Sequence, residues 1–214
     1  AFQWTYDFQL EQVRELGMPV LGQFFGTPYW AARDGTLPKQ KTGDYPYPNP
    51  PDPDAFERYV RATVERYRDV IHYWEVWNEP DVSLFWKGSP EAFAELALRA
   101  CRAAKEADPD CMVMVGGFTS SAWDWHERAA AAGALREADA ISFHYGCPLK
   151  SPEETYRELE AVVTHFRDLA ERFGRGREIP LWSTEGGTPD TTWLRGMEQP
   201  ELPLSLEQDT WYSL

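Results

Sequence analysis

Short apolar runs alternate with longer amphipathic segments along most of the chain. The runs are nearly continuous in hydrophobic residues, as in strands buried on both faces, and they occupy residues 19–25, 71–78, 111–118, 140–145 and 179–185. In the segments between them, apolar residues recur three and four positions apart, which predicts helices with one buried face. This alternation predicts a parallel sheet covered by helices.

Capping residues predict where the helices begin and end. A polar residue followed by proline opens three helices, at Asp52-Pro53, Ser89-Pro90 and Ser151-Pro152. Glu154 extends the last of these to a capping box. Asp7 is predicted to cap an earlier helix that ends at Gly17. Two more helices are expected, over residues 123–138 with a break near Gly133, and from 206 to 214.

Two architectures contain such alternating strands and helices: an open doubly wound sheet and a closed eight-stranded barrel. The nucleotide-binding form of the open sheet has three spaced glycines after a strand, and neither Gly116-Gly117 nor Gly186-Gly187 is followed by the third. The barrel is therefore favoured. A complete barrel has eight strands and about 250 residues. With five predicted strands, we expect an α/β fold, a partial (β/α)8 TIM barrel, in one domain spanning residues 1–214.

Composition limits the binding partners. The 214 residues are 43% hydrophobic, enough for one buried core, and their net charge of −14 disfavours binding to nucleic acid or anionic membranes. No apolar run reaches the ~20 residues of a membrane span. The three cysteines form no CxxC pair, and His72, His126 and His165 are predicted to lie apart. The negative charge therefore favours a neutral substrate. Because the cysteines and these histidines form no cluster, we expect neither a metal nor another cofactor.

Two predicted strands end in a glutamate close to tryptophan, at Trp77-Asn78-Glu79-Pro80 and at Trp182-Ser183-Thr184-Glu185. In a parallel barrel the carboxyl ends of all strands lie at one mouth, where the catalytic residues of such enzymes are found. Two carboxyl groups there can divide the roles of acid and nucleophile, which is the chemistry that cleaves glycosidic bonds. Glu75 lies deeper on the same side of its strand and is expected to be structural.

Ten tryptophans is a high number for a chain of this length. Most are expected to fill the core, because aromatic rings bury a large area. Four of them fall at strand ends or in the following loops, where a flat ring can stack on the apolar face of a sugar. These candidate substrate contacts are Trp30, Trp77, Trp86 and Trp182.

Three segments occur in an informative order along the chain. They are Trp77-Asn78-Glu79-Pro80, the predicted strand Ile141-Ser142-Phe143-His144-Tyr145, and Thr184-Glu185-Gly186. In this order and spacing the chain resembles clan A of the retaining glycoside hydrolases. In that clan an Asn-Glu pair ends the fourth strand and a second glutamate ends the seventh. The resemblance therefore implies that strands three to seven are present, and that the chain is an excerpt without the first two strands and the last.

Within the clan, residues 74–81 and the following Phe85-Trp86 are most similar to family 39, which includes β-xylosidases and α-L-iduronidases. Families 5 and 51 share part of these motifs and stay open as alternatives. The resemblance implies that Glu79 is the general acid and base and Glu185 the nucleophile of a double displacement through a covalent glycosyl-enzyme intermediate. Asn78 would hydrogen-bond the sugar 2-hydroxyl.

His144 and Tyr145 are expected to donate hydrogen bonds that keep Glu185 ionised. The expected activity is therefore hydrolysis of O-glycosidic bonds in an oligosaccharide or polysaccharide. One alternative is a carbohydrate-binding barrel that keeps the aromatic residues without turnover. Another, a metal-dependent barrel hydrolase, would require clustered histidines and acids, and the sequence predicts no such cluster.

Overall fold

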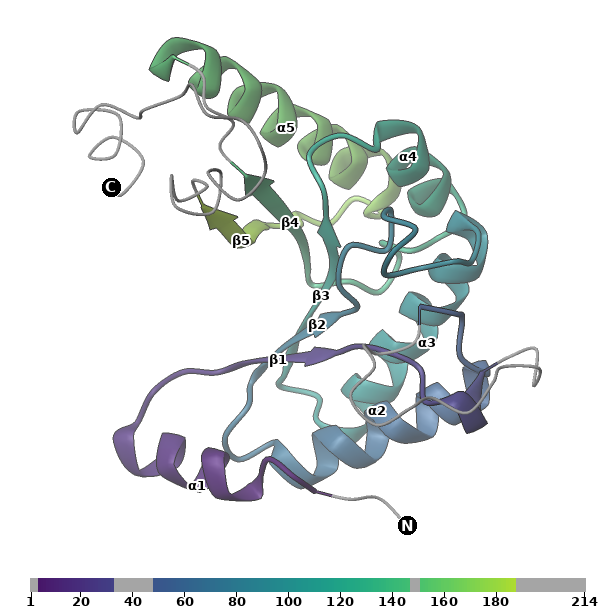
Figure 1. Cartoon of the computed structure of the whole chain (residues 1–214), viewed down its shortest axis with the longest axis vertical. Coiled ribbons are helices and arrows are strands. Elements are labelled where there is room, and N and C mark those ends of the chain that lie inside the picture. The colour runs from purple at the N-terminus through teal and green to yellow at the C-terminus, as the bar shows by residue number, and fades with distance from the viewer. Residues whose placement is uncertain (1–3, 33–47, 147–150, 188–214) are drawn as a thin grey trace, which may run out of the picture.

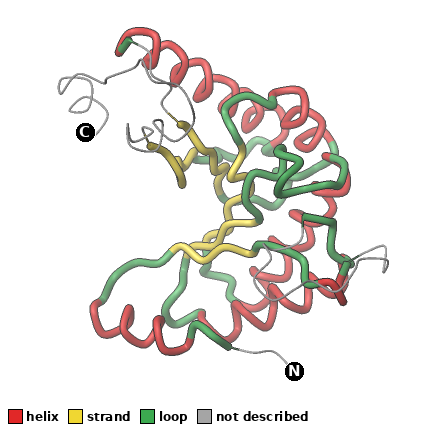
Figure 2. Tube along the Cα trace, viewed as in Figure 1, coloured by secondary structure: helices red, strands yellow, loops and turns green. Residues whose placement is uncertain are grey.

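Five parallel strands form a curved sheet in the computed structural model, which describes residues 4–32, 48–146 and 151–187 (Figures 1 and 2). They lie side by side in chain order: β1 (Leu21–Phe24), β2 (Tyr73–Val76), β3 (Met112–Phe118), β4 (Ala140–Gly146) and β5 (Leu181–Gly187). A doubly wound sheet reverses its strand order part of the way across, whereas a barrel adds each strand beside the last. The sheet is therefore part of a (β/α)8 barrel, as predicted.

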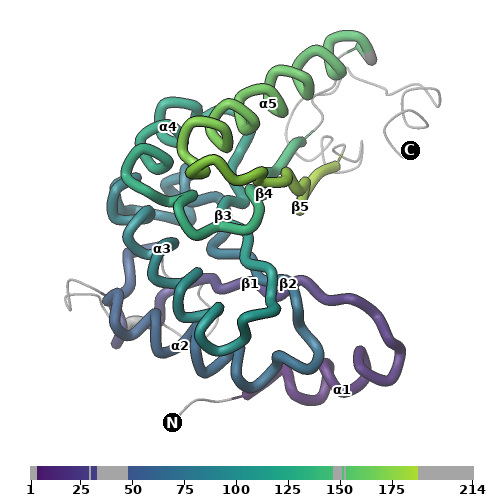
Figure 3. Tube along the Cα trace, turned by 180° about the vertical axis from the view of Figure 1, so that it is seen from behind, coloured from purple at the N-terminus to yellow at the C-terminus, as the bar shows by residue number. Residues whose placement is uncertain are grey.

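Helices connect consecutive strands and lie along the outer side of the curved sheet, except for α1, which precedes β1 (Figure 3). They are α1 (Asp7–Leu16), α2 (Pro53–Tyr67), α3 (Pro90–Ala107), α4 (Trp123–Ala131) and α5 (Pro152–Phe173), with a short 3-10 helix, η1 (Tyr29–Ala31), after β1. Within the described ranges, none of these helices is both long enough and apolar enough to cross a bilayer. Because all strands are parallel, their carboxyl ends meet at one mouth of the barrel.

The predicted caps are confirmed at three helices. Asp52, Ser89 and Ser151 each accept a hydrogen bond from the backbone N–H three residues further on. Each satisfies one of the free donors of a helix amino terminus. Gly17 ends α1 in the left-handed conformation, with φ of 63°.

Asp7 does not cap α1 as predicted. The N-cap position is held by Tyr6, whose side chain makes no capping bond, and Asp7 is the first helical residue. Its carboxylate instead accepts a hydrogen bond from the hydroxyl of Tyr67 at 2.8 Å and forms an ion pair with Arg66. Bonds from a guanidinium and a phenol on α2 thus engage this carboxylate and tie α1 to that helix.

α4 is shorter than the predicted helix over residues 123–138. It ends at Ala131, and Gly133 follows with φ of 107°. Only glycine adopts this backbone conformation without strain, so the predicted break is real, although the helix stops before it. The helix predicted over 206–214 lies outside the described residues.

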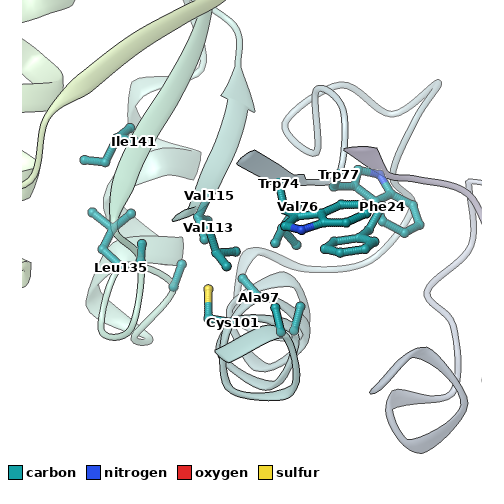
Figure 4. Close-up of a cluster of buried hydrophobic side chains, with 14 of the residues drawn as sticks. Phe24, Trp74, Val76, Trp77, Ala97, Cys101, Val113, Val115, Leu135 and Ile141 are labelled. Atoms are coloured by element: carbon teal, nitrogen blue, oxygen red, sulfur yellow. The ribbon is translucent and has the colours of Figure 1, made fainter. Parts of the chain in front are cut away.

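The hydrophobic core lies between the sheet and its helices. Trp74 of β2 is 2% exposed and stacks on Phe24 of β1, with ring centroids 4.7 Å apart. Cys101 is one of the small residues that α3 places against the neighbouring strands (Figure 4). Burial raises the pKa of its thiol, so Cys101 stays protonated and serves as a core residue.

Polar side chains connect distant strands on the inner side of the barrel wall. Glu75 of β2 is 2% exposed and accepts hydrogen bonds from Gln23 of β1 and from Thr184 of β5, each at 2.7 Å. The bond from Thr184 bridges the concave side past β3 and β4. These partners confirm the prediction that Glu75 has a structural role, because a buried carboxylate needs such donors.

Candidate active site

Glu79 lies in a tight turn directly after β2. Trp77 and Glu79 both have a left-handed backbone, with φ of 73° and 43°. This conformation is strained for residues other than glycine and is often kept at functional sites. The backbone N–H of Trp77 donates to Phe24 at 2.9 Å, and that of Glu79 donates to Gly117 at 3.0 Å. Bonds to the neighbouring strands β1 and β3 thus fix where the Glu79 side chain begins.

A pair of glycines makes room for this turn. Gly116 and Gly117 form a β-bulge, where β3 has one residue more than β4. A Cβ atom on Gly116 would lie 2.0 Å from the carbonyl oxygen of Ser142, and one on Gly117 would lie 3.4 Å from the backbone nitrogen of Glu79. The close approach of the strands therefore requires glycine at 116, and the φ of 55° favours glycine at 117.

A second β-bulge orients Glu185. Phe143 pairs with Ser183, whereas the next residue, His144, pairs with Glu185, so Thr184 is an extra residue of β5. Side chains alternate along a regular strand, which would put Glu185 on the same side as Ser183, facing α5. The extra residue shifts this alternation and turns Glu185 toward His144 on the inner side.

The two predicted glutamates meet at the mouth of the barrel. The Nδ1 atom of His144 lies 3.0 Å from Oε1 of Glu79 and 3.6 Å from Oε2 of Glu185. One oxygen of each carboxylate and this nitrogen all lie within 4.8 Å of one another. The side chains differ in exposure, at 21% for Glu79 and 66% for Glu185. Two neighbouring carboxyl groups in unlike surroundings can take different roles in proton transfer.

His144 holds a different partner from the one expected. The sequence predicted a hydrogen bond to Glu185, but the separation of 3.6 Å is too long for one. The contact with Glu79 at 3.0 Å is a hydrogen bond, and the ring is 6% exposed. His144 is therefore a buried partner of Glu79 that also lies close to Glu185.

The same three side chains offer ligands for a divalent cation. An imidazole nitrogen and two carboxylate oxygens are ligands that zinc and other transition metals accept. Glu79, His144 and Glu185 present these atoms within 4.8 Å of one another. These residues were predicted to share a site but not to act as metal ligands, and the expectation of a metal-free site stays a prediction.

Two of the four candidate tryptophans belong to the core instead. Trp77 and Trp86 are 0% and 3% exposed and pack against each other with ring centroids 5.0 Å apart. Their indole N–H groups donate to the backbone oxygens of Phe85 and Ser89. These rings are covered by protein and cannot stack on a sugar, so both predictions are wrong.

The other two candidate tryptophans are accessible. Trp30 is 67% exposed and lines an apolar cavity of about 220 Å³ together with Phe25, Phe56 and Tyr59. Trp182 is half-buried on the inner side of β5 and packs against Tyr73, with ring centroids 5.4 Å apart. Aromatic surfaces therefore remain at the end of β1 and inside the barrel wall.

Tyr145 does not face Glu185 as predicted. Its hydroxyl donates to the backbone oxygen of Thr155 in α5 at 3.0 Å. Successive residues of a strand point to opposite sides, so His144 on the inner side places Tyr145 on the outer side. Asn78 is half-buried beside Glu79, and its contact with a substrate stays a prediction.

Two histidines that were expected to lie apart form a pair below the turn of Glu79. Nδ1 of His126 lies 3.2 Å from Nε2 of His165, and Nε2 of His126 lies 2.8 Å from Oδ2 of Asp81. His126 lies on α4 and His165 on α5, so the prediction that they are separate is wrong. Burial raises the pKa of Asp81, but hydrogen bonds from His126 and Thr119 outweigh this effect and lower it overall.

His165 makes stability depend on pH. Burial, assisted by the neighbouring His126, lowers its pKa from the ordinary 6.5 to about 4. Between these two values the unfolded chain binds a proton that the folded chain does not, so stability falls as the pH is lowered through this window. We expect the melting temperature of His165→Gln to fall less between pH 7 and pH 4.5 than that of the wild type. Glutamine keeps an N–H donor for His126 without titrating.

Thermal melts of both proteins over this pH range measure the effect. His72, which is exposed, supplies the matched control, because His72→Gln should lose stability as the wild type does. Parallel pH profiles for His165→Gln and the wild type would contradict the assignment of the acid-sensitive group.

Fold and site together define a class: a partial (β/α)8 barrel with two carboxylates brought together at the carboxyl ends of β2 and β5. No known family model matches the chain. A curated protein from rice, Oryza sativa subsp. japonica, described as chloroplastic beta-glucosidase-like SFR2, is 33% identical over 79 residues. This match covers 36% of the present chain and 11% of the rice protein.

Several solved structures of similar fold are described as glycoside hydrolases. A glucosidase from Croceicoccus marinus superposes with a TM-score of 0.63 at 17% identity, covering 93% of this chain and 39% of that enzyme. A monomeric beta-xylosidase from Caulobacter crescentus CB15 gives 0.60 at 20% identity, covering 89% and 42%. The family 39 enzyme from Xanthomonas axonopodis pv. citri gives 0.51 at 23% identity, covering 66% and 31%.

The chain thus spans less than half the length of each of these enzymes. The likeness confirms the predicted fold, a partial (β/α)8 barrel, which family 39 enzymes share.

Proposed function

We propose that the chain belongs to the catalytic domain of a retaining glycoside hydrolase. The observation that carries this proposal is the approach of Glu79 and Glu185, with carboxylate oxygens within 4.8 Å of each other. Retaining enzymes place their two carboxyl groups about 5 to 5.5 Å apart, whereas inverting enzymes separate them by about 6.5 to 9.5 Å to admit a water molecule. The approach of one oxygen of each group to within 4.8 Å supports the shorter, retaining arrangement, in which a carboxylate attacks directly.

Glu185 is the proposed nucleophile. Its carboxylate attacks the anomeric carbon while Glu79 gives a proton to the departing glycosidic oxygen, which forms a covalent glycosyl-enzyme intermediate and releases the first product. Glu79 then takes a proton from a water molecule that attacks the same carbon and displaces Glu185.

His144 supports the proton transfer by Glu79. Its Nδ1 atom is 3.0 Å from Oε1 of Glu79 and can accept a hydrogen bond from the protonated acid or donate one to the carboxylate, depending on the tautomer. The ring therefore orients Glu79 in both protonation states. Asn78 is proposed to bind the sugar 2-hydroxyl, whose hydrogen bond strengthens in the transition state.

The proposed substrate is a neutral oligosaccharide or polysaccharide. The net charge of −14 disfavours an anionic ligand, and the accessible rings of Trp182 and Trp30 offer flat surfaces on which a sugar can stack. Solved structures of similar fold include enzymes described as a glucosidase and a beta-xylosidase. Glucosides and xylosides are therefore the first substrates to test.

A mechanism-based label tests the proposal. Incubation with 2-deoxy-2-fluoro glucosides and xylosides that carry a dinitrophenyl leaving group should trap the intermediate, and peptide mass spectrometry should find the sugar ester on Glu185. Turnover of the matching unfluorinated glycosides should first release the product anomer with the configuration of the substrate, as followed by proton NMR. Saturable sugar binding without labelling or turnover would support the carbohydrate-binding barrel instead.

A further inference from the structure

A buried carboxylate stands directly behind the turn that carries Glu79. Asp81 follows two residues later, and its side chain is 0% exposed. Its Oδ2 atom accepts hydrogen bonds from the backbone N–H of Thr119 at 2.9 Å, from the hydroxyl of Thr119 at 2.6 Å and from Nε2 of His126 at 2.8 Å. Asp81 thus joins the turn after β2 to the segment after β3 and to α4.

The connection continues to the outer layer of the barrel. Nδ1 of His126 lies 3.2 Å from Nε2 of His165 on α5, and the ring of Trp123 stacks on His165 with centroids 4.9 Å apart. The carboxylate of Asp81 only accepts, so Nε2 of His126 must carry a proton. In a neutral His126 the Nδ1 atom then accepts a hydrogen bond from Nε2–H of His165. One tautomer of each ring satisfies the whole series of hydrogen bonds.

The turn needs such support because its backbone is strained. Glu79 has φ of 43°, and left-handed residues other than glycine persist only where the surroundings over-determine them. Main-chain bonds hold the turn at the nitrogen of Glu79, which donates to Gly117, and at its oxygen, which accepts from Val82 at 3.0 Å. Two residues after Glu79, the charged side chain of Asp81 attaches the same turn to Thr119 and His126.

We propose that Asp81 is a positioning residue that holds Glu79 in its working orientation through Thr119, His126 and His165. This inference rests on the proposed role of Glu79 as general acid and base. Asp81 does not touch the reacting atoms. It fixes the backbone from which the acid projects, and a displacement of a catalytic group by about 1 Å can cost a factor of 10² in rate.

Asp81→Asn tests the proposal, since it keeps the shape of the side chain and removes its charge. The readout compares two glycosides of the same sugar, one with a phenyl and one with a 2,4-dinitrophenyl leaving group. A misplaced acid slows departure of the phenolate that needs a proton and spares the one that does not. We expect kcat/KM to fall about 10²-fold for the phenyl glycoside and by less than about threefold for the dinitrophenyl glycoside.

A general structural defect would lower both rates equally, and that result would overturn the proposal, as would wild-type rates on both substrates. Asp124→Asn, which changes an exposed aspartate at the start of α4, should behave as the wild type. Thr119→Val removes a single hydroxyl donor and is the milder second variant. If Asp81→Asn does not fold, Thr119→Val decides: a loss confined to the phenyl glycoside supports the proposal, and no loss or an equal loss overturns it.

A crystal structure of Asp81→Asn gives an answer that does not depend on activity. We expect Glu79 to leave the left-handed region and its 3.0 Å contact with His144 to be lost. An unchanged turn would overturn the positioning role. If the wild type instead hydrolyses neither glycoside and takes up no fluoro-sugar, the proposed function fails by itself, and the crystal structure still decides whether Asp81 holds the turn.

Discussion

Glu185→Ala is expected to lower kcat on an unactivated glycoside by at least about 10⁴-fold, a barrier increase of ~5.5 kcal/mol. In the proposed mechanism this carboxylate supplies the covalent step that divides one difficult displacement into two easier ones, and its loss would leave no nucleophile on that face of the sugar. Steady-state kinetics with a phenyl glycoside measure the effect. Glu160→Ala, an exposed position on α5, controls for the removal of a surface carboxylate and should keep wild-type activity.

Azide should restore turnover to Glu185→Ala. The anion fits the space of the missing carboxylate and attacks the anomeric carbon from the same face, so the product is a glycosyl azide of inverted configuration. NMR of the product establishes its stereochemistry. Hydrolysis at the wild-type rate, or a glycosyl azide of retained configuration, would show that Glu185 is not the nucleophile.

Glu79→Ala is expected to separate substrates by their leaving groups. Hydrolysis of a phenyl glycoside should fall by about 10² to 10⁴-fold, the usual contribution of a positioned general acid. The first step with a 2,4-dinitrophenyl glycoside should proceed nearly unchanged, because this leaving group departs without a proton. The second step lacks its base, so the glycosyl-enzyme accumulates, and both kcat and KM should fall.

The product formed by Glu79→Ala with azide distinguishes the two glutamates. Azide should attack the accumulated intermediate on Glu185 and give a glycosyl azide with the configuration of the substrate, opposite to the product of Glu185→Ala. A burst of dinitrophenolate in stopped-flow measurements reports the accumulation. An inverted azide from Glu79→Ala would exchange the two assigned roles.

The strands, most helix boundaries and the meeting of the two acids could be predicted from the sequence. Continuous apolar runs identify strands buried on both faces, and caps such as Asp52 and Ser151 act locally, so their effect does not depend on the rest of the fold. Glu79 and Glu185 could be brought together because parallel strands share one carboxyl end. The order of strands and helices along the chain is enough to predict this meeting.

The remaining features depend on contacts between elements. Trp86 has the sequence position of a loop residue, but Phe93 of α3 and Trp77 cover its ring. His126 and His165 meet because α4 and α5 turn those faces toward each other, and the rotation of one helix relative to the next is not encoded locally. Tyr145 is an exception, because the alternation of side chains along a strand is enough to place it on the opposite side of the sheet from His144.

The orientation of Glu185 could not be predicted from the regular alternation of side chains, because of the β-bulge at Thr184. Regular alternation from Trp182 on the inner side would turn Glu185 toward α5. An extra residue in a strand leaves no consistent mark in the sequence, and here it reverses the direction of a proposed catalytic side chain. The positions of the strand ends predicted that the two acids meet. The β-bulge that turns Glu185 toward the inner side is visible only in the structure.

The hydrogen bonds of Glu75 have a consequence for the spacing of the two acids. Glu75 lies four residues before Glu79, and its partner Thr184 immediately precedes Glu185. The 2.7 Å hydrogen bond between them joins β2 to β5 across the concave side of the sheet. It therefore limits how far apart these two strands can lie. Glu75 takes no part in the proposed reaction, but it thereby restricts the distance between Glu79 and Glu185.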